Sequence, residues 1–164
     1  MIKVALVDKH PVVCDALEAL LSGMDDIEIV GSRSSMNELY LMVNEQPVHV
    51  ALVVLYQPDP NDAVHIKILS DRFPKVKVLV LSMYRNEEFI LKLIKAGAKG
   101  HLSRETDRSE IMEAIYTLRN GYEFYAKTIT NILLSSYLSD KDIDLKEKEN
   151  RQVYKRPHCG NPQE

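Results

Sequence analysis

The sequence of 164 residues has no tryptophan, only six glycines and only two cysteines. The two cysteines, Cys14 and Cys159, are too few for the disulfide framework of a small secreted protein. No apolar run approaches the roughly 20 residues that span a bilayer, and no glycine-rich loop of the kind that holds nucleotide phosphates is present. These absences favour a cytoplasmic protein that is not a nucleotide enzyme.

Neither sign of charge dominates the chain. It has 21 lysines and arginines against 24 aspartates and glutamates, for a formal net charge of −3. A chain with this balance has no general attraction for nucleic acid or for an anionic membrane. Hydrophobic residues make up 45% of the sequence, which suffices for a buried core in one domain with a tail.

A short apolar run at 49–58, rich in valine and punctuated by Pro47 and Pro58, is typical of a strand buried on both faces. Four further segments have strand character: 2–7, 27–31, 76–81 and 101–103. Helical periodicity follows each strand, and the helix after the central strand is expected to begin at Asn61 or Asp62. Strand and helix alternate five times, which predicts an α/β fold: a five-stranded parallel sheet with helices on both faces.

The chain changes character after this alternation. Apolar residues at helical spacing over 127–138 predict an extra helix. From 139 to 164, charges of both signs are dense and apolar residues are sparse, so this region is expected to be a disordered tail. The predicted organisation is therefore a domain over 1–122, an extra helix with its linker over 123–138, and the tail over 139–164.

Polar residues follow three of the predicted strands. Asp8 and Lys9 follow the first strand, Ser82 closes the fourth and Arg104 follows the fifth, whereas the central strand presents only Val54. Ligands of open α/β sheets bind beyond these carboxyl ends. A divalent cation with oxygen ligands needs more than one carboxylate, so no metal site is predicted here. Two loop carboxylates after the central strand are candidates to approach this edge: Asp59 and Asp62.

Several of these motifs, in this order and spacing, resemble a response-regulator receiver domain of the NarL/LuxR class of bacterial transcription regulators. The motifs are Asp8-Lys9-His10-Pro11, the 49–58 strand, Val80-Leu81-Ser82 and the run from Gly97 to Arg104. The resemblance covers about residues 1–138 and implies a flavodoxin-like fold with strand order 2-1-3-4-5. It also implies a non-enzymatic part in two-component signal transduction, with the fourth helix, fifth strand and fifth helix as the surface that contacts a protein partner or a second copy.

The sequence departs from the family pattern at chemically important positions. The resemblance places the phosphoacceptor aspartate at Val54, which has no nucleophilic oxygen, and the second acidic residue, a metal ligand, at Lys9. The phosphate-gripping lysine falls at Arg104, whose planar fork is no simple equivalent. The hydroxyl switch residue is present as Ser82, and the aromatic switch position is His101. We therefore expect that phosphate is not accepted and that Mg²⁺ binding is weak or lost.

One hypothesis for such a degenerate pocket is internal charge pairing. The ammonium of Lys9 would occupy the volume of the metal and pair with Asp8, while Arg104 would pair with Asp8 or Asp59. The simpler interpretation has Lys9 solvated, Arg104 at the surface or the rim, and Ser82 bonded to nearby backbone. For His101, the simpler interpretation is that a histidine stands in place of the family's tyrosine at a partly buried site.

Three functions are compatible with the sequence. The favoured one is an atypical response regulator that acts through protein contacts. The alternative is the regulatory half of a NarL/LuxR-type DNA-binding regulator that is truncated or frameshifted before its helix-turn-helix, because 145–149 resembles the start of that domain and the apolar pattern then stops. The third retains phosphorylation at Asp59 or Asp62.

Overall fold

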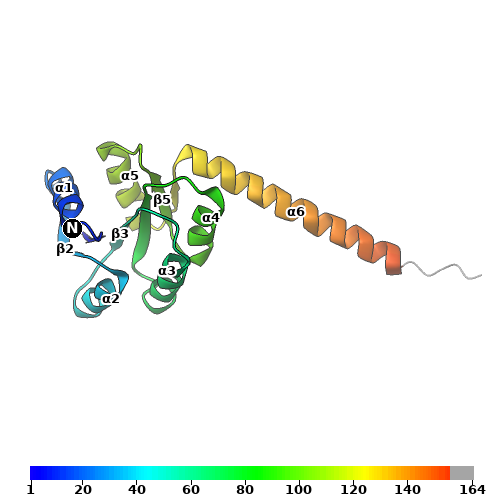
Figure 1. Cartoon of the computed structure of the whole chain (residues 1–164), viewed down its shortest axis with the longest axis horizontal. Coiled ribbons are helices and arrows are strands. Elements are labelled where there is room, and N and C mark those ends of the chain that lie inside the picture. The colour runs from blue at the N-terminus through cyan, green and yellow to red at the C-terminus, as the bar shows by residue number, and fades with distance from the viewer. Residues whose placement is uncertain (156–164) are drawn as a thin grey trace, which may run out of the picture. The chain divides into compact units, whose positions relative to one another are not determined.

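A computed structural model describes residues 1–155, apart from the side chains at 142–144 and 152–155. It divides into two compact units, Met1–Ala126 and the part that starts at Lys127. The first unit holds a parallel sheet in the order β2-β1-β3-β4-β5-β6, with helices between the strands (Figure 1). Its elements are β1 (Ile2–Val7), α1 (Pro11–Leu21), β2 (Ile27–Arg33), α2 (Met36–Glu45), β3 (Val50–Leu55), α3 (Pro60–Arg72), β4 (Lys77–Ser82), α4 (Glu87–Ala96), β5 (Gly100–Ser103), α5 (Arg108–Arg119) and β6 (Phe124–Tyr125).

The central strand β3 confirms the interpretation of the apolar run. It pairs with β1 on one side and β4 on the other, and its first five residues are buried. A strand in this position is covered by helices on both faces, so both sets of alternating side chains must be apolar. This is why its sequence, VALVVL, lacks the polar alternation of an edge strand.

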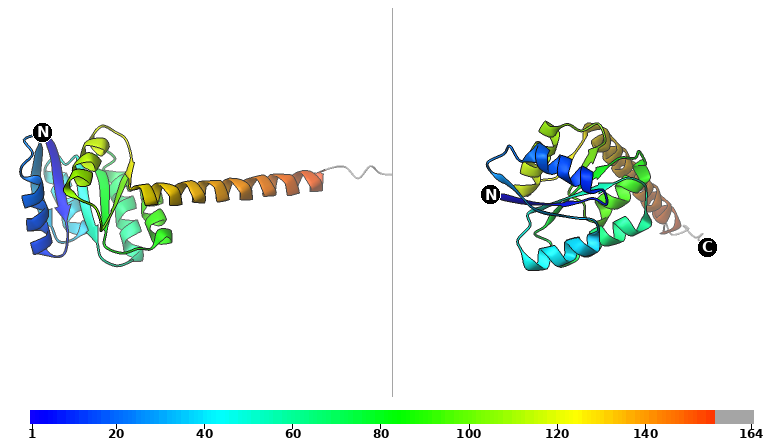
Figure 2. Two further views of the ribbon diagram at one scale, coloured as in Figure 1. Left: turned by 90° about the horizontal axis from the view of Figure 1, so that it is seen from above. Right: turned by 60° about the vertical axis from the view of Figure 1, so that its left-hand side comes forward.

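Two hydrophobic cores lie on opposite faces of the sheet. Residues of α1 and α5 form one core with side chains such as Leu6, Leu52 and Val54. Residues of α2, α3 and α4 form the other with side chains such as Val7 and Val53. Figure 2 shows α1 and α5 on one side of the sheet and α2 to α4 on the other. The two-residue period of β3 thus sends Val53 and Val54 to different cores.

Capping residues set the helix starts. The side chains of Asn86 and Asp107 accept hydrogen bonds from backbone N–H groups in the first turns of α4 and α5. The start predicted for α3 is wrong: Asp59 is its cap, accepting from Asn61 N at 2.9 Å, and Pro60 is the first helical residue. Proline suits that position because its missing N–H would have no partner there.

The sheet has six strands instead of the five predicted. Phe124 and Tyr125 pair in parallel with Gly100 and His101 of β5, which extends the first unit to Ala126, past the expected boundary at 122. The chain reaches this edge through a turn at Gly121, whose φ is +90°, a value that favours glycine. A two-residue strand carries no periodic signal, so no pattern in the sequence predicted it.

The second unit contains α6 (Lys127–Lys155). The prediction of a disordered tail is wrong for 139–155, where the helix continues; residues 156–164 lie outside the described residues. This segment has no glycine or proline before Pro157, and acid–base spacings such as Glu147 with Arg151 favour a helix at i and i+4. Within the described residues, no helix is both long and apolar enough to cross a membrane.

Candidate functional site

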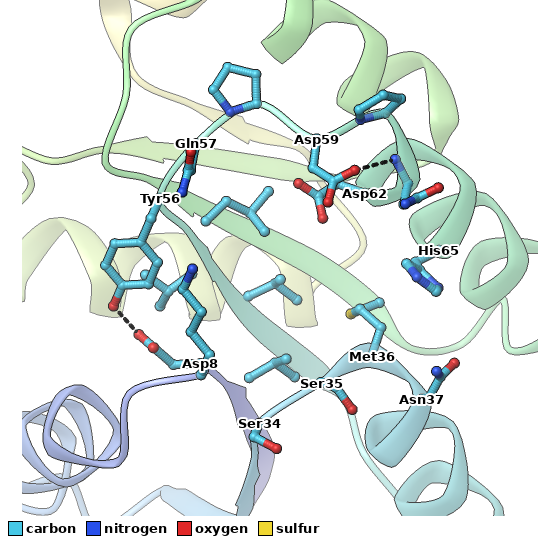
Figure 3. A pocket seen from close by; sticks show the side chains of 18 residues that line it. Asp8, Ser34, Ser35, Met36, Asn37, Tyr56, Gln57, Asp59, Asp62 and His65 are labelled. Atoms are coloured by element: carbon cyan, nitrogen blue, oxygen red, sulfur yellow. Dashed lines mark hydrogen bonds between the residues drawn. The ribbon is translucent and has the colours of Figure 1, made fainter.

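The candidate site is a cleft of ≈ 560 Å³ at the carboxyl ends of β1 and β3. Its walls come from the turn after β1, the loop between β2 and α2, and the loop from β3 into α3 (Figure 3). The structure brings five of the predicted site residues together here: Asp8, Lys9, Val54, Asp59 and Asp62. Ser82, His101 and Arg104 are not among the residues that line it.

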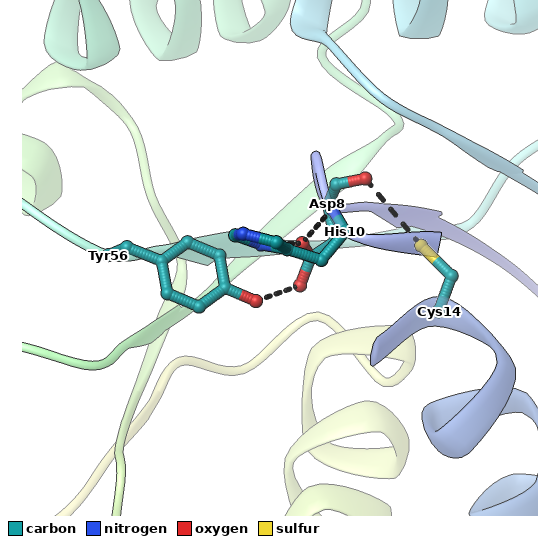
Figure 4. A network of polar contacts seen from close by, with 4 residues as sticks. All are labelled: Asp8, His10, Cys14 and Tyr56. Carbon is teal, nitrogen blue, oxygen red and sulfur yellow. Dashed lines mark hydrogen bonds and ion pairs between the residues drawn. The ribbon is translucent and has the colours of Figure 1, made fainter. Parts of the chain in front are cut away.

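Asp8 is buried, with 3% of its surface exposed. Hydrogen-bond donors from other residues of the protein contact its carboxylate. The hydroxyl of Tyr56 donates to Oδ2 at 2.5 Å, and the backbone N–H of His10 donates to Oδ1 at 2.7 Å (Figure 4). The Nδ1 atom of His10 also lies 3.2 Å from Oδ1. Cys14 donates its thiol to the backbone oxygen of Asp8 at 3.7 Å. Both carboxylate oxygens therefore have partners within the protein.

Tyr56 covers Asp8 and also contacts its neighbours. The His10 ring packs edge-on against the Tyr56 ring with 4.6 Å between the centroids. Burial raises the pKa of Tyr56 well above its usual range, and the hydrogen bond to Asp8 raises it further. The hydroxyl therefore stays protonated as a donor at neutral pH. Sequence reasoning missed this residue, although its place just after β3 was a usable signal.

Lys9 does not fill the role of a metal substitute. It is exposed, its Nζ atom lies 5.5 Å from the centroid of the Tyr56 ring, and it makes no ion pair with Asp8 in the described part of the chain. The predicted Lys9–Asp8 pair is therefore wrong. The physical reason is that the carboxylate already has donors, so burial of the ammonium would cost desolvation without a compensating contact.

Val54 stands at the floor of the cleft where β3 ends. It is 5% exposed and belongs to the core under α1 and α5. Val7 pairs with Val53, so the next residues on the two strands, Asp8 and Val54, lie at the same level of the sheet. An aliphatic side chain therefore stands beside the buried carboxylate, and it offers no atom that can form an acyl phosphate.

Two more carboxylates line the cleft, both at the start of α3. Asp59 is engaged as the helix cap, whereas Asp62 lies in the first turn and is half-buried. Burial raises the pKa of Asp62 to about 6, the neighbouring charge of Asp59 raises it as well, and Lys9 opposes the shift. The Asp62 carboxyl therefore titrates closer to neutral pH than an ordinary aspartate does.

Ser82 and His101 form a separate buried pair between β4 and β5. Ser82 Oγ lies 2.8 Å from His101 Nε2 and 3.3 Å from the backbone oxygen of Tyr84. One hydroxyl hydrogen can serve one acceptor, so a proton on Nε2 completes a chain from His101 through Ser82 to Tyr84 O. Nδ1 has no hydrogen-bond partner in the described structure, and burial lowers the pKa of His101 to about 4. The ring is thus neutral at physiological pH.

Arg104 lies at the surface, away from the cleft. Its side chain is 58% exposed and its Nε atom is 3.6 Å from Glu105, which also pairs with Arg85. The predicted pairing of Arg104 with Asp8 or Asp59 is therefore wrong. The exposed guanidinium retains its hydration here, and an ion pair between such exposed groups contributes little stability. Of the two simpler interpretations of Arg104, at the surface or at the rim, the surface position fits this geometry.

A model of the response regulator receiver domain matches residues 4–116, most of the chain. The chain belongs to the response regulator receiver domain family. It is 26% identical over 143 residues to the oxygen regulatory protein NreC of Staphylococcus haemolyticus, covering 87% of this chain and 66% of that protein. NreC of Staphylococcus aureus is 27% identical over the same length. The chain therefore spans slightly less than two thirds of these curated relatives.

Solved receiver structures share the fold. The isolated receiver domain of RcsB from Salmonella enterica serovar Typhimurium superposes with a TM-score of 0.70 at 19% identity, covering 80% of this chain and 97% of that one. A LuxR-family response regulator from Aurantimonas gives 0.73 at 21% identity, covering 83% and 97%. These comparisons confirm the flavodoxin-like receiver fold, with β6 as the addition to the expected strand order.

The receiver fold implies a divalent cation beside the acidic residues, and the donor set of this chain does not fit one. Both oxygens of Asp8 have donors, and the neighbouring position holds the cation of Lys9. The described residues contain no group of three or more histidine, cysteine, aspartate or glutamate side chains that could hold a metal ion. Mg²⁺ is usually bound through one or two carboxylates and water, and the buried carboxylate of Asp8 already has protein donors at both oxygens.

Proposed function

We propose that this receiver domain, of the NarL/LuxR type, does not accept a phosphoryl group in its cleft and acts through protein contacts. The observation that supports this proposal most strongly is Val54, a buried aliphatic side chain beside Asp8 where the family resemblance places the phosphoacceptor. The bond from Tyr56 to Asp8 adds to it, because it satisfies the carboxylate without a cation.

The proposed contact surface is the face of α4, β5 and α5. Arg85, before α4, and Glu105, after β5, form an exposed ion pair that links the two loops, and Arg104 extends it. Behind this surface, Ser82 and His101 join β4 to β5. None of these residues lines the cleft, which supports a contact surface that does not need phosphorylation there.

The phosphorylation test uses the full chain with acetyl phosphate and Mg²⁺, followed by intact mass measurement. We expect no gain of a phosphoryl group. A double variant, Lys9→Asp with Val54→Asp, restores the two carboxylates and serves as the reference for reconstituted chemistry, alongside a receiver domain that carries all its acidic residues. A gain of one phosphoryl group by the unaltered chain would overturn the proposal, and loss of that gain in Asp62→Asn or Asp59→Asn would locate it.

A second measurement tests whether output depends on phosphate. Sedimentation velocity of the full chain before and after treatment with acetyl phosphate and Mg²⁺ should give the same distribution of species. The receiver domain that carries all its acidic residues is the control for active reagent. A change in association state of the unaltered chain would contradict the proposal, because it would require the cleft to control the contact surface.

The second candidate function is the receiver half of a DNA-binding regulator. It is favoured by one observation: the similarity to NreC covers 143 residues, beyond the 4–116 range of the receiver model. The nucleotide sequence across codons 140–164 and beyond tests this candidate in all three frames. An apolar helix-turn-helix pattern in a shifted frame would support it, and the absence of such a pattern would remove the frameshift version.

A further inference from the structure

A second groove lies at the amino ends of β3 and β4, at the edge of the sheet opposite to the candidate cleft. Its volume is ≈ 790 Å³, and it is lined by the end of α2, the segment before β3, the connection from α3 into β4, and the end of α5. All of these elements belong to the first unit. The receiver chemistry considered above does not use this groove.

Four cationic side chains line the groove: Arg72, Lys75, Lys77 and Arg119. No carboxylate is among the lining residues that the structure describes, and none of the four cations has a carboxylate within 4.0 Å in the described part of the chain. The nearby Asp71 is paired with Lys67, at 3.2 Å. The groove therefore concentrates positive charge, although the whole chain carries a net charge of −3.

The fold positions these cations. Arg72 and Arg119 lie in the last turns of α3 and α5, where the helix dipole favours positive side chains. The Arg72 guanidinium lies 5.7 Å from the centroid of the Phe73 ring, and Lys77 Nζ donates to the backbone oxygen of Pro74 at 3.3 Å. These contacts orient two of the cations without neutralising them, so their charges remain available to a ligand.

His49, on the groove wall, lies close enough to Arg119 to respond to its charge. Its Nδ1 accepts a hydrogen bond from the backbone N–H of Lys3 at 2.9 Å, so Nε2 carries the proton in the neutral ring. Burial lowers the pKa of His49, and the charges of Arg119, Lys3 and the amino terminus lower it further. The positive groups are therefore close enough to disfavour one more positive charge.

We propose that this groove binds a small polyanion with two or more phosphoryl groups, of the pyrophosphate or nucleoside triphosphate class. Four unpaired cations match several negative charges in a small volume. The volume lies within the usual range for sites of small ligands, and Val43, Pro47 and Phe73 add an apolar wall for an organic group. The proposal is independent of phosphorylation in the cleft.

Isothermal titration calorimetry of the full chain tests the proposal in the presence of EDTA, so that no metal bridges the partners. The probes are pyrophosphate, ATP, inorganic phosphate and a single-stranded oligonucleotide. We expect one site per chain for pyrophosphate and ATP, binding that weakens as salt increases, and much weaker binding of inorganic phosphate. Tighter binding of ATP than of pyrophosphate assigns a role to the apolar wall, and equal binding assigns recognition to the phosphates alone.

Two double variants with the same change in net charge make the test specific. Lys75→Glu with Arg119→Glu should weaken binding of pyrophosphate by about tenfold or more, because charge-assisted hydrogen bonds to phosphate are lost. Lys146→Glu with Lys148→Glu, on the exposed part of α6, should leave it unchanged. Thermal unfolding checks that both variants fold.

The His49 ring gives a readout that a purely structural role would not move. Bound pyrophosphate should raise the pKa of His49 in an NMR titration, because an anion offsets the surrounding positive charges, whereas His10 should not respond. The proposal would be overturned if pyrophosphate and ATP did not bind at low salt, or if both double variants weakened binding equally. It would also be overturned if the pKa of His49 did not change on binding, or if the oligonucleotide bound more tightly than ATP.

Discussion

The hydroxyl of Tyr56 donates a 2.5 Å hydrogen bond to Oδ2 of the buried Asp8, across 48 positions of the chain. This bond joins the turn after β1 to the loop after β3, the two segments that form the floor of the cleft. It also gives a buried carboxylate a neutral donor in place of a cation. The stability of this end of the sheet should therefore depend on it.

Removal of the hydroxyl in Tyr56→Phe should lower the free energy of unfolding by about 1–3 kcal/mol at pH 7, since a buried carboxylate loses a partner. Urea denaturation measures the change. Tyr122→Phe is the matched control, because Tyr122 is largely exposed. Equal stability of Tyr56→Phe and the unaltered protein would show that the Asp8–Tyr56 bond contributes nothing net.

Alkaline pH should destabilise the fold through its tyrosines. Burial holds the pKa of Tyr56, Tyr84 and Tyr125 above the ordinary value near 10 in the folded state. Above about pH 10 the unfolded chain releases protons that the folded chain retains, so stability is full below that pH and falls as pH rises. Unfolding in urea at pH 9 and pH 11 measures this fall, and Tyr56→Phe should reduce it.

Acid should act through His101. Its pKa falls from an ordinary 6.5 to about 4 on folding, so between these values the unfolded chain binds a proton that the folded chain does not. The contribution is fully present above pH 6.5, and about 3 kcal/mol of stability is lost as pH falls to 4. The slope of unfolding free energy against pH should be shallower in His101→Phe. An unchanged slope would show that His101 is not the group responsible.

A carboxylate at position 54 should be costly in the unaltered surroundings. Val54→Asp buries a charge beside Asp8 and should lower stability at pH 7 by about 2–4 kcal/mol more than the uncharged Val54→Asn. Because burial raises the pKa of the introduced carboxyl, the difference between the variants should shrink as pH falls and the group becomes neutral. A constant difference from pH 7 to pH 4 would contradict this explanation.

Alanine substitutions at two glycines with positive φ distinguish the cost of backbone strain from the cost of steric overlap. A Cβ at Gly97, where φ is +129°, would overlap the Ser70 hydroxyl, whereas a Cβ at Gly121, where φ is +90°, would meet nothing within 4 Å. Gly97→Ala should cost about 2–4 kcal/mol and Gly121→Ala about 1 kcal/mol. Chemical denaturation of both variants tests the difference, and equal costs would show that Ser70 moves aside freely.

The sequence predicted five strands and the helices that follow them, because β3 is apolar throughout and the helical segments carry apolar residues at helical spacing. It also indicated which residues end the strands. It did not predict the contacts of these residues, because Asp8 bonds to Tyr56 at a separation of 48 positions, and no local pattern encodes that choice. The ion pairs expected of Lys9 and Arg104 were wrong for the same reason: Lys9 lines the cleft without an ion pair to Asp8, and Arg104 pairs with Glu105 at the surface.

The length of α6 was missed for a different reason. Sparse apolar residues after 138 indicated disorder, but lysine, glutamate and leucine have high helix propensity, and a helix can continue without a buried face. The residue composition therefore favoured a helix, whereas the lack of apolar periodicity indicated disorder. The pairing of β6 with β5 is a tertiary contact, and a strand of two residues shows no periodic pattern in the sequence.

The bond between Tyr56 and Asp8 also bears on how this protein can evolve. An aspartate introduced at position 54 would lie beside an acid whose oxygens already have hydrogen-bond donors, with Lys9 as the residue after that acid. We expect that phosphoryl chemistry in this cleft would need aspartates at positions 9 and 54 together, and Val54→Asp alone would lower the stability of the fold. The bond between Tyr56 and Asp8 therefore makes the effect of a substitution at position 54 depend on a residue from another segment of the chain, which is epistasis between positions far apart in the sequence.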